Sequence, residues 1–397
     1  MASISLFDLP AGKIRVTLDA EFRKELFGAL LKKHGSFSAI ARAFGLGRGE
    51  SARRYSVGRS GMPLSFLARA ADELGINGRK IEKKVIELKT LKSKEKIKNP
   101  KLPFEILTEE FGLVVGGVLG DGGIEKSKMR VWYFNNERQQ VDSFVGAVVS
   151  TFGDVRFARH RSTSGVPCVI FPKIIGVILG TIGIPDGNKN YNYELGIPRQ
   201  FIAAGDRKPL IALLRRLFDD DGCVVDNYHC RVITLICPTT AAEETAAKKP
   251  QLLSDVQQSL EVMGIKSKIV VRGRNFKSSG EVTLNWTLII SGRENLRKYL
   301  EKVGFGLERK ENKLVHVLGR YVDGLESFPR HEASENYIKA ITNLNAQGVL
   351  ATASGISKAC KRSGRHVRDV LLRMSEEGLV ERKLTGNKFA YCVAGGA

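Results

Sequence analysis

The sequence lacks the cysteine patterns that mark disulfide scaffolds and zinc sites. Its six cysteines include no Cys-X-X-Cys pair and no Cys/His metal spacing; they are Cys168, Cys223, Cys230, Cys237, Cys360 and Cys392. No signal peptide is visible at the N-terminus. The longest apolar run, near 174–184, contains three glycines and is too short to span a bilayer. We therefore expect free thiols, a prokaryotic cytoplasmic location and no membrane partner.

Two familiar ligand-binding loops are also missing. The segment GGVLGDGG at 116–123 has no Gly-Lys-Ser/Thr, which a P-loop needs to hold phosphates. The segment DDDG at 219–222 lacks the ligand spacing of an EF-hand. Neither a P-loop nucleotide site nor an EF-hand calcium site is therefore expected.

Acidic residues are the scarcer charge. The chain holds 42 Asp and Glu against 63 Lys and Arg, a net charge of +21 and a pI near 9.7. Residues 1–101 contribute +12, residues 102–330 contribute +5 and residues 331–397 contribute +4. This balance favours a polyanionic partner, and because the basic flanks look folded we expect nucleic acid rather than solvated arms.

The N-terminal part has the outline of a helix-turn-helix domain over 1–78. An amphipathic helix is expected over 14–33, followed by a short helix that Ser36 caps and Gly45 ends. A second helix from about Gly49 carries Arg53 and Arg54 as candidate DNA contacts. An ordinary helical bundle is the alternative for this segment.

Basic and winged segments flank the centre of the chain. Residues 79–103 hold ten Lys and Arg and are expected to form a basic linker or helix that contacts phosphates. Residues 331–397 predict three helices and a hairpin, a winged-helix domain whose third helix carries Arg365 and Arg368. A dimerisation module or a structural cap is the alternative for the C-terminal segment.

The centre contains an internal repeat. Each copy, over 104–206 and 207–330, begins with an apolar helix that ends in Gly-Asp-Gly or Asp-Asp-Gly. Each then continues as a strand pair, a helix, a second strand pair and a final helix. The predicted fold class is α+β, with two pseudo-symmetric αββαββα halves in one chain and their first helices side by side.

The acids at the ends of these helices need a physical explanation. Asp121 and Asp221 fall where the helix macrodipole is already negative, which disfavours carboxylates by roughly 0.3–1 kcal/mol each. A single Asp-Gly ending is ordinary turn chemistry. Two such endings in equivalent repeats predict instead a shared site in which a divalent cation offsets the charge, and Mg²⁺ suits paired carboxylates with substrate phosphate.

The two segments Val114–Gly122 and Leu214–Gly222 resemble the motif of the LAGLIDADG homing endonucleases in their two-repeat, single-chain form. The resemblance covers roughly 105–320. It implies that Asp121 and Asp221 bind catalytic Mg²⁺ or Mn²⁺, with the carbonyls of Gly120 and Asp220 as further ligands. It also implies a catalytic lysine after each repeat, for which Lys189 and Lys310 are the candidates and Lys313 is a second choice.

The resemblance further implies a saddle of strands that lies over a DNA major groove. Side chains that alternate along the strands would read the bases; the candidates are Arg130, Trp132, Arg159, Arg231, Arg272 and Arg274. Asn136 is a weaker candidate for positioning water. The expected partner is double-stranded DNA with a long asymmetric target site, bound by a monomer that acts as a pseudo-dimer.

Two departures from the family pattern bear on function. Arg216 stands where the first motif has Gly116, so we expect either that the helices separate or that Arg216 extends outward. Asp219 corresponds to Leu119 in the first motif. The favoured function is a site-specific, metal-dependent DNA endonuclease of a mobile element. The alternatives are a non-cutting regulator of the WhiA type, which Arg216 and the added DNA-binding modules favour, and an RNA maturase.

Overall fold

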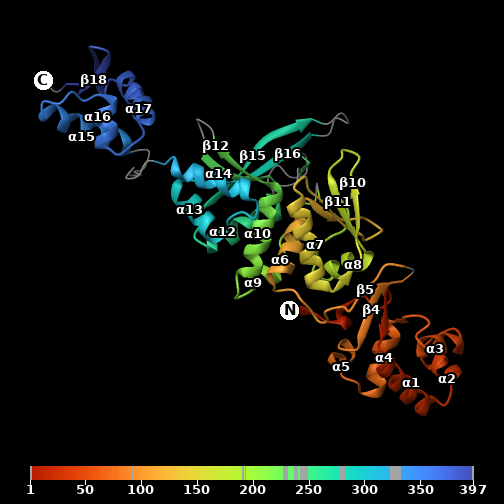
Figure 1. The fold of residues 1–397 in the computed structure, drawn as a ribbon. Helices are drawn as coiled ribbons and strands as arrows, with labels where there is room; N and C mark the ends of the chain where they lie inside the picture. Colours follow the sequence, from red (N-terminus) through yellow and green to blue (C-terminus); the bar gives the residue numbers. More distant parts are fainter. Residues whose placement is uncertain are drawn as a thin grey trace. The chain divides into compact units, whose positions relative to one another are not determined.

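The computed structural model describes residues 2–91, 93–189, 192, 194–226, 231–236, 240–241, 249–276, 282–321 and 332–395. It divides into two units, 1–318 and 319–397, which are described separately below (Figure 1). Helices and antiparallel sheets occur in both, so the predicted α+β class is confirmed. The four cysteines in the described ranges are free thiols. No helix within these ranges combines the length and the apolar character needed to cross a membrane.

The N-terminal residues contain one strand that the sequence analysis assigned to a helix. Residues 14–18 form strand β2 (Ile14–Leu18), in which every second side chain is buried, and helix α1 (Ala20–His34) begins only after it. The prediction of one helix over 14–33 is therefore wrong at its start. Ile14, Val16 and Leu18 are buried at every second position, which is the spacing of a strand. The helical spacing of buried residues begins only at Phe22.

The next helices have the predicted bounds. Helix α2 (Phe37–Ala43) begins at Ser36, whose hydroxyl accepts a hydrogen bond from the Ala39 N–H at 3.2 Å. Helix α3 (Gly49–Ser56) leaves Arg53 and Arg54 exposed, and helix α4 (Leu64–Leu74) follows. Whether this helix pair binds DNA remains a prediction.

Residues 79–103 were predicted as a basic linker or helix, but only 79–82 are helical and most of the segment lies in and around two strands. Beyond the end of the short helix α5 (Gly78–Glu82), the segment forms the strands β4 (Val85–Thr90) and β5 (Ile97–Lys98). Their lysines alternate with buried Leu88 and Ile97, a pattern that the high lysine content concealed. The strands lie in an antiparallel sheet of order β3-β2-β4-β5-β9, where β3 is Met62–Pro63 and β9 is Asp154–Val155 of the first repeat. One sheet therefore joins the N-terminal part to the first repeat.

The two central repeats have the predicted αββαββα order. The first consists of α6 (Glu109–Leu119), β7 (Gly122–Ile124), β8 (Val131–Phe134), α7 (Arg138–Phe152), β10 (Ala158–Arg161), β11 (Pro167–Phe171) and α8 (Lys173–Thr181). The second consists of α10 (Lys208–Asp221), β12 (Gly222–Asp226), β13 (Arg231–Ile236), α12 (Gln251–Val262), β15 (Ser267–Phe276), β16 (Val282–Ser291) and α13 (Arg293–Lys302). The short helix α9 (Arg199–Ala203) lies between them, and the helix α14 (Glu308–Gly319) follows the second.

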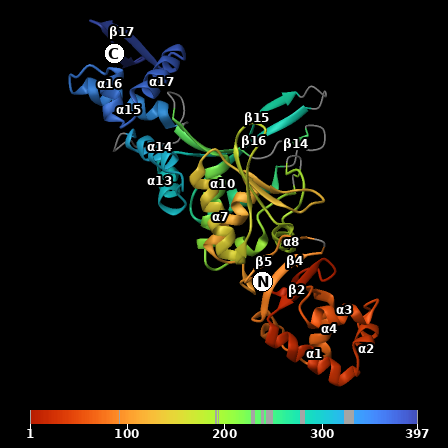
Figure 2. The same ribbon diagram turned by 45° about the vertical axis from the view of Figure 1, so that its right-hand side comes forward.

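The sheets of the two repeats are equivalent strand by strand. The first has the antiparallel order β7-β8-β11-β10 and the second has β12-β13-β16-β15, with the additional strand β14 (Thr240–Ala241) also paired to β16 (Figure 2). Helices α6 and α10 lie side by side (Figure 1). The pseudo-two-fold arrangement expected from the repeat is therefore present.

The C-terminal unit has three helices and a hairpin, in the predicted order. They are α15 (Ala333–Ala346), α16 (Ala353–Ala359), α17 (Gly364–Glu376), β17 (Val380–Thr385) and β18 (Lys388–Val393). Tyr337, Ile356, Leu371 and Val380 contribute to its own buried core. The domain boundary expected at 331 lies outside the described residues. Whether this unit acts as a winged helix on DNA remains a prediction.

Candidate metal centre at the paired motif helices

Helices α6 and α10 pack backbone against backbone. A Cβ atom added to Gly112 would lie 2.2 Å from the Pro209 carbonyl oxygen, and one added to Gly116 would lie 2.5 Å from that of Leu213. Such distances do not occur between real atoms, so only glycine permits this approach. The contact brings the C-terminal ends of the two helices, and with them Asp121 and Asp221, together.

The interface between α6 and α10 is asymmetric, although the two repeats have the same order of helices and strands. Gly116 faces the Cβ of Arg216, and Gly120 faces the Cβ and carboxylate of Asp220, with distances of 2.6–2.9 Å from the positions where glycine Cβ atoms would stand. The glycines therefore belong to one helix and the large side chains to the other. The side chains of α10 pass over the glycines of α6 and enter the first repeat.

Arg216 does not behave as either alternative expected. The helices remain in contact, and the side chain is buried with 1% of its surface exposed. Its guanidinium donates hydrogen bonds to the Gln140 side chain and, at 2.8 Å, to the Ser143 hydroxyl, both on α7. It also lies 5.7 Å from the centre of the Tyr133 ring, a cation–π contact. The Arg216 side chain extends into the first repeat because Gly116, which has no side chain, leaves space for it.

The acids that precede Asp221 have separate partners. The Asp219 carboxylate accepts hydrogen bonds from the backbone N–H groups of Gly306 and Leu307 at 2.9–3.1 Å, just before α14. Asp220 accepts one from the Tyr133 hydroxyl at 2.6 Å and one from the Asp121 backbone N–H at 3.3 Å. These two aspartates therefore tie α10 to neighbouring elements and do not require a cation.

Asp121 and Asp221 form the acidic pair. Asn135 donates a hydrogen bond to the Asp121 carboxylate at 2.9 Å, whereas no described group donates one to the Asp221 carboxylate. Burial raises the pKa of Asp121, opposed by the charges of Lys189 and Lys310. Burial, and then the charge of Asp121, raise the pKa of Asp221 to about 7. Two partly buried carboxylates that repel each other are a place where a cation would be favourable.

Both predicted lysines lie at the ends of the motif helices. The Lys189 ammonium donates hydrogen bonds to the carbonyls of Val118, Leu119 and Gly120, and that of Lys310 to the carbonyls of Phe218, Asp219 and Gly222. Burial lowers the pKa of Lys310, which is 8% exposed. Lys313, the second choice in the same helix, is exposed.

The donor set fits a hard divalent cation. In the described ranges, no three His, Cys, Asp or Glu side chains gather where they could enclose a metal, so the protein side chains would supply the two carboxylates of Asp121 and Asp221. Mg²⁺ commonly binds in this way, with water and substrate phosphate completing its six ligands. The Gly120 carbonyl already accepts a hydrogen bond from Lys189, and the metal roles of Gly120 and Asp220 remain predictions.

The raised pKa of Asp221 leads to a test on the metal-free protein. A carboxyl whose pKa rises from 3.8 to about 7 on folding holds its proton more tightly when folded, so stability falls as pH rises through that interval. We expect the melting temperature in EDTA to fall from about pH 4 to about pH 7. Asp221→Asn should show a smaller fall. Equal falls in both proteins would contradict the assignment.

The residues predicted to contact DNA do not all lie on the same face of their sheets. Trp132 alternates with buried Val131 and Tyr133, so it lies on the open face, which points away from α7, and its ring packs against Phe134 at 4.9 Å. Arg130 pairs with Glu125 at 2.8 Å. Arg272 and Arg274 are exposed on β15. Arg365 and Arg368 are exposed on α17 of the C-terminal unit.

Two of these arginines do not lie on the open face. Arg159 is in register with buried Val169 and bonds to Asp142 of α7 at 2.7 Å, so it lies on the helix side of its sheet. Arg231 is in alternation with Ile233 and pairs with Asp226 at 3.6 Å across the strands. Both side chains therefore lie on the other face from Trp132, and whether they contact DNA remains a prediction.

Sequence reasoning missed Asn135 and named its exposed neighbour Asn136. Asn135 is buried and its amide contacts both Asp121 and Asp220, at 2.9 and 3.3 Å. The alternation that places Tyr133 inward also places Asn135 inward. Two polar residues on the inward face of a strand would have been a usable sign of the site.

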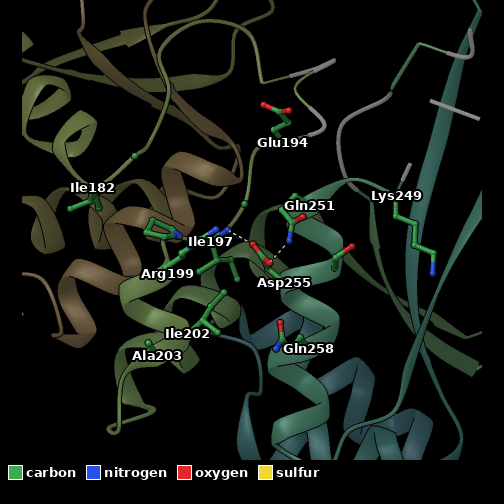
Figure 3. Close-up of a pocket in the computed structure, with 14 residues that line it drawn as sticks. Ile182, Glu194, Ile197, Arg199, Ile202, Ala203, Lys249, Gln251, Asp255 and Gln258 are labelled. Atoms are coloured by element: carbon green, nitrogen blue, oxygen red, sulfur yellow. Dashed lines mark hydrogen bonds between the residues drawn. The ribbon is translucent and has the colours of Figure 1, made fainter. Parts of the chain in front are cut away.

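The acidic pair does not lie in the cleft that Figure 3 shows. A cleft of about 1130 Å³ lies between the segment after α8 and helix α12, with Glu194, Arg199 and Lys249 among its lining residues (Figure 3). In it, Asp255 accepts hydrogen bonds from the Ile197 N–H at 2.8 Å and from Gln251 at 2.7 Å. This contact holds the segment between the repeats against the second repeat. The acidic pair lies elsewhere, at the ends of α6 and α10.

Comparison with known families gives a match within the second repeat. Residues 208–304 match a family described as the LAGLIDADG-like domain. The matched LAGLIDADG-like segment begins and ends almost with α10 and α13, and it contains Arg216 and the three consecutive aspartates. The first repeat has the same order of elements as the matched segment.

The individual proteins and structures to which this chain is similar are distant from it. The replication factor C small subunit of Methanocaldococcus jannaschii is 22% identical over 281 residues, which are 70% of this chain but only 14% of that relative. A structure of I-DmoI in complex with DNA and Ca is 13% identical, covers 52% of this chain and 97% of its own, and has a TM-score of 0.34. Full-length DUF199/WhiA from Thermatoga maritima is 12% identical, covers 70% and 93%, and also has a TM-score of 0.34.

Proposed function

We propose that this protein is a site-specific double-stranded DNA endonuclease that depends on Mg²⁺ or Mn²⁺. One observation carries the proposal. Asp121 and Asp221 lie at the ends of two closely packed helices in equivalent repeats, and burial together with the charge of Asp121 raises the pKa of Asp221 to about 7. The LAGLIDADG-like assignment of the second repeat supports the same class of reaction.

The residues present would share the chemistry in a simple way. Asp121 and Asp221 would hold the metal, which when bound activates water and stabilises the leaving oxygen of a phosphodiester. Asn135 orients the Asp121 carboxylate through its 2.9 Å hydrogen bond. The close contact at Gly112 and Gly116 fixes the separation of the two acids. The open sheet faces, with Trp132 on the first, would lie against the DNA.

A cleavage assay tests this proposal directly. The full chain is incubated with a randomised duplex library and Mg²⁺, and cut ends are recovered and sequenced; a parallel reaction contains EDTA. The proposal predicts cutting at one long asymmetric sequence in Mg²⁺ only. Selective retention of one sequence with no cut ends would reject the endonuclease and favour the second candidate.

That second candidate is a non-cutting DNA-binding regulator, and Arg216 favours it. Burial raises the pKa of Asp220, whose carboxylate is next to the acidic pair, well above its usual value, and the charge of the buried guanidinium opposes this rise. The same charge opposes the rise in the pKa of Asp121. The protein therefore already places a permanent positive charge near its acids. A fold that needs no metal for stability could bind DNA without cutting it.

The helix-turn-helix prediction has a separate test. Deleting residues 1–101 would remove strands beside β9, so substitutions are the cleaner probe. If Arg53 and Arg54 contact phosphates, Arg53→Ala/Arg54→Ala should reduce the slope of log K against log salt by about 2. Lys24→Ala/Lys32→Ala on α1 removes the same charge from another helix. Equal slope changes in the two variants would reject specific phosphate contacts by α3.

A further inference from the structure

The ends of both motif helices lack a local cation. The last four carbonyls of an α-helix have no partner within it and carry partial negative charge. Neither α6 nor α10 has a basic residue in its last turn, and α10 ends in three consecutive aspartates. In both repeats the missing positive charge comes from a lysine distant in sequence, 69–71 residues from its acceptors in the first repeat and 88–92 in the second.

The two lysines make nearly the same contacts. Lys189 binds the carbonyls of residues 118, 119 and 120, and Lys310 binds those of residues 218, 219 and 222. An ammonium group has three N–H donors and no acceptor. In Lys310 the three carbonyls, at 2.5–3.0 Å, account for all three donors. This arrangement leaves Lys310 no donor for a phosphate or a water.

We propose that Lys189 and Lys310 are positioning residues, each of which caps the C-terminal end of a motif helix and thereby fixes Asp121 or Asp221. The role differs from the water activation or phosphate stabilisation expected from the family resemblance. The metal part of this inference rests on the proposed function, whereas the capping part does not. Each lysine follows the final helix of its repeat. A residue at the end of each repeat therefore binds the C-terminal end of the helix with which that repeat begins.

The first readout is hydrogen exchange of the helix ends in the full chain without metal. Lys310→Met should speed exchange of the amides at 217–222, and Lys189→Met those at 117–122. Leu314→Ala is the matched control: it removes a buried side chain from α14, the helix of Lys310, but leaves the ammonium in place. Lys313→Met controls for loss of a lysine from the same helix.

The second readout is binding of Tb³⁺, a luminescent substitute for Mg²⁺ and Ca²⁺. Tyr133, whose hydroxyl lies 2.6 Å from the Asp220 carboxylate, is close enough to sensitise the emission. We expect Lys310→Met to weaken Tb³⁺ binding about 10-fold or more, as for other groups that orient metal ligands. Leu314→Ala, measured well below its melting temperature, should bind as the wild type does.

The outcomes separate positioning from the alternatives. If the lysines acted only through charge, their removal would tighten Tb³⁺ binding, because an ammonium repels a metal cation. Tighter or unchanged binding, or unchanged exchange at the helix ends, would overturn the inference. If Lys310→Met does not fold, the partly exposed Lys189 provides the same comparison. If the wild type binds no Tb³⁺, the proposed metal site fails, while exchange still decides whether the lysines cap the helices.

Discussion

Asp221→Asn is expected to reduce DNA cleavage by about 100-fold or more while leaving DNA affinity nearly unchanged. A metal that activates water and stabilises a leaving oxygen contributes several kcal/mol, and each 1.36 kcal/mol is worth about tenfold in rate. The substitution keeps the size of the side chain but removes one of the two carboxylates that would hold the metal. Because Asp221 accepts no described hydrogen bond, little structural disturbance should accompany the loss.

The measurement is a single-turnover cleavage time course on the sequence recovered from the library, with a parallel binding titration in Ca²⁺. Asp121→Asn should behave in the same way, because the other acid of the pair is then lost. Glu261→Gln, on the exposed part of α12, removes an equal charge and should cut at the wild-type rate. Cleavage at that rate by Asp221→Asn would show that the acidic pair is not the catalytic site.

Gly116→Val is expected to have the largest effect on stability. Its Cβ would lie 2.5 Å from the Leu213 carbonyl oxygen and 2.9 Å from the Arg216 Cβ, and neither the backbone nor the buried arginine can withdraw. Overpacking in a core costs about 1–3 kcal/mol, and separation of the two helices would add the loss of their shared contact. We expect a loss of about 3 kcal/mol or more in urea unfolding.

Gly146→Ala is the matched control for this prediction. Gly146 lies within α7, is exposed, and an added Cβ would meet nothing within 4 Å. Alanine there should stabilise the protein by about 0.5–1 kcal/mol, because it restricts the unfolded chain and favours the helix. Similar unfolding midpoints for the two variants would contradict the close packing of α6 and α10.

The features predicted correctly from sequence are those that depend on local order. Helical spacing followed by Asp-Gly gave both motif helices, and the shared order of strands and helices after each gave the two repeats. Ser36 correctly marked a helix start, and the hairpin predicted after the third C-terminal helix is present. In each case the residues that decide the structure are neighbours in the chain.

The features that were missed depend on partners far away in the chain. Arg216 binds Gln140 and Ser143, which precede it by 76 and 73 residues, and no local pattern identifies them. Lys189 and Lys310 were named from the sequence as residues of the site. The backbone carbonyls that they bind could not be predicted, because these carbonyls lie far away in the chain. The faces of Arg159 and Arg231 follow from the strand register, which their charge alone does not give. The strands β4 and β5 were missed because lysine content outweighed the spacing of their few apolar residues.

The distribution of glycines between α6 and α10 has a consequence for exchanging the halves of this chain. The surface of the first motif helix is recessed at Gly112, Gly116 and Gly120. The facing surface of α10 carries the protruding side chains of Arg216 and Asp220. In a chain made of two copies of the second half, the Arg216 of one copy would face the Arg216 of the other. Two guanidinium groups would then lie in one buried site. Two copies of the first half would leave a channel between the helices. The halves have become complementary rather than interchangeable, so a functional chimera must retain one motif helix of each kind.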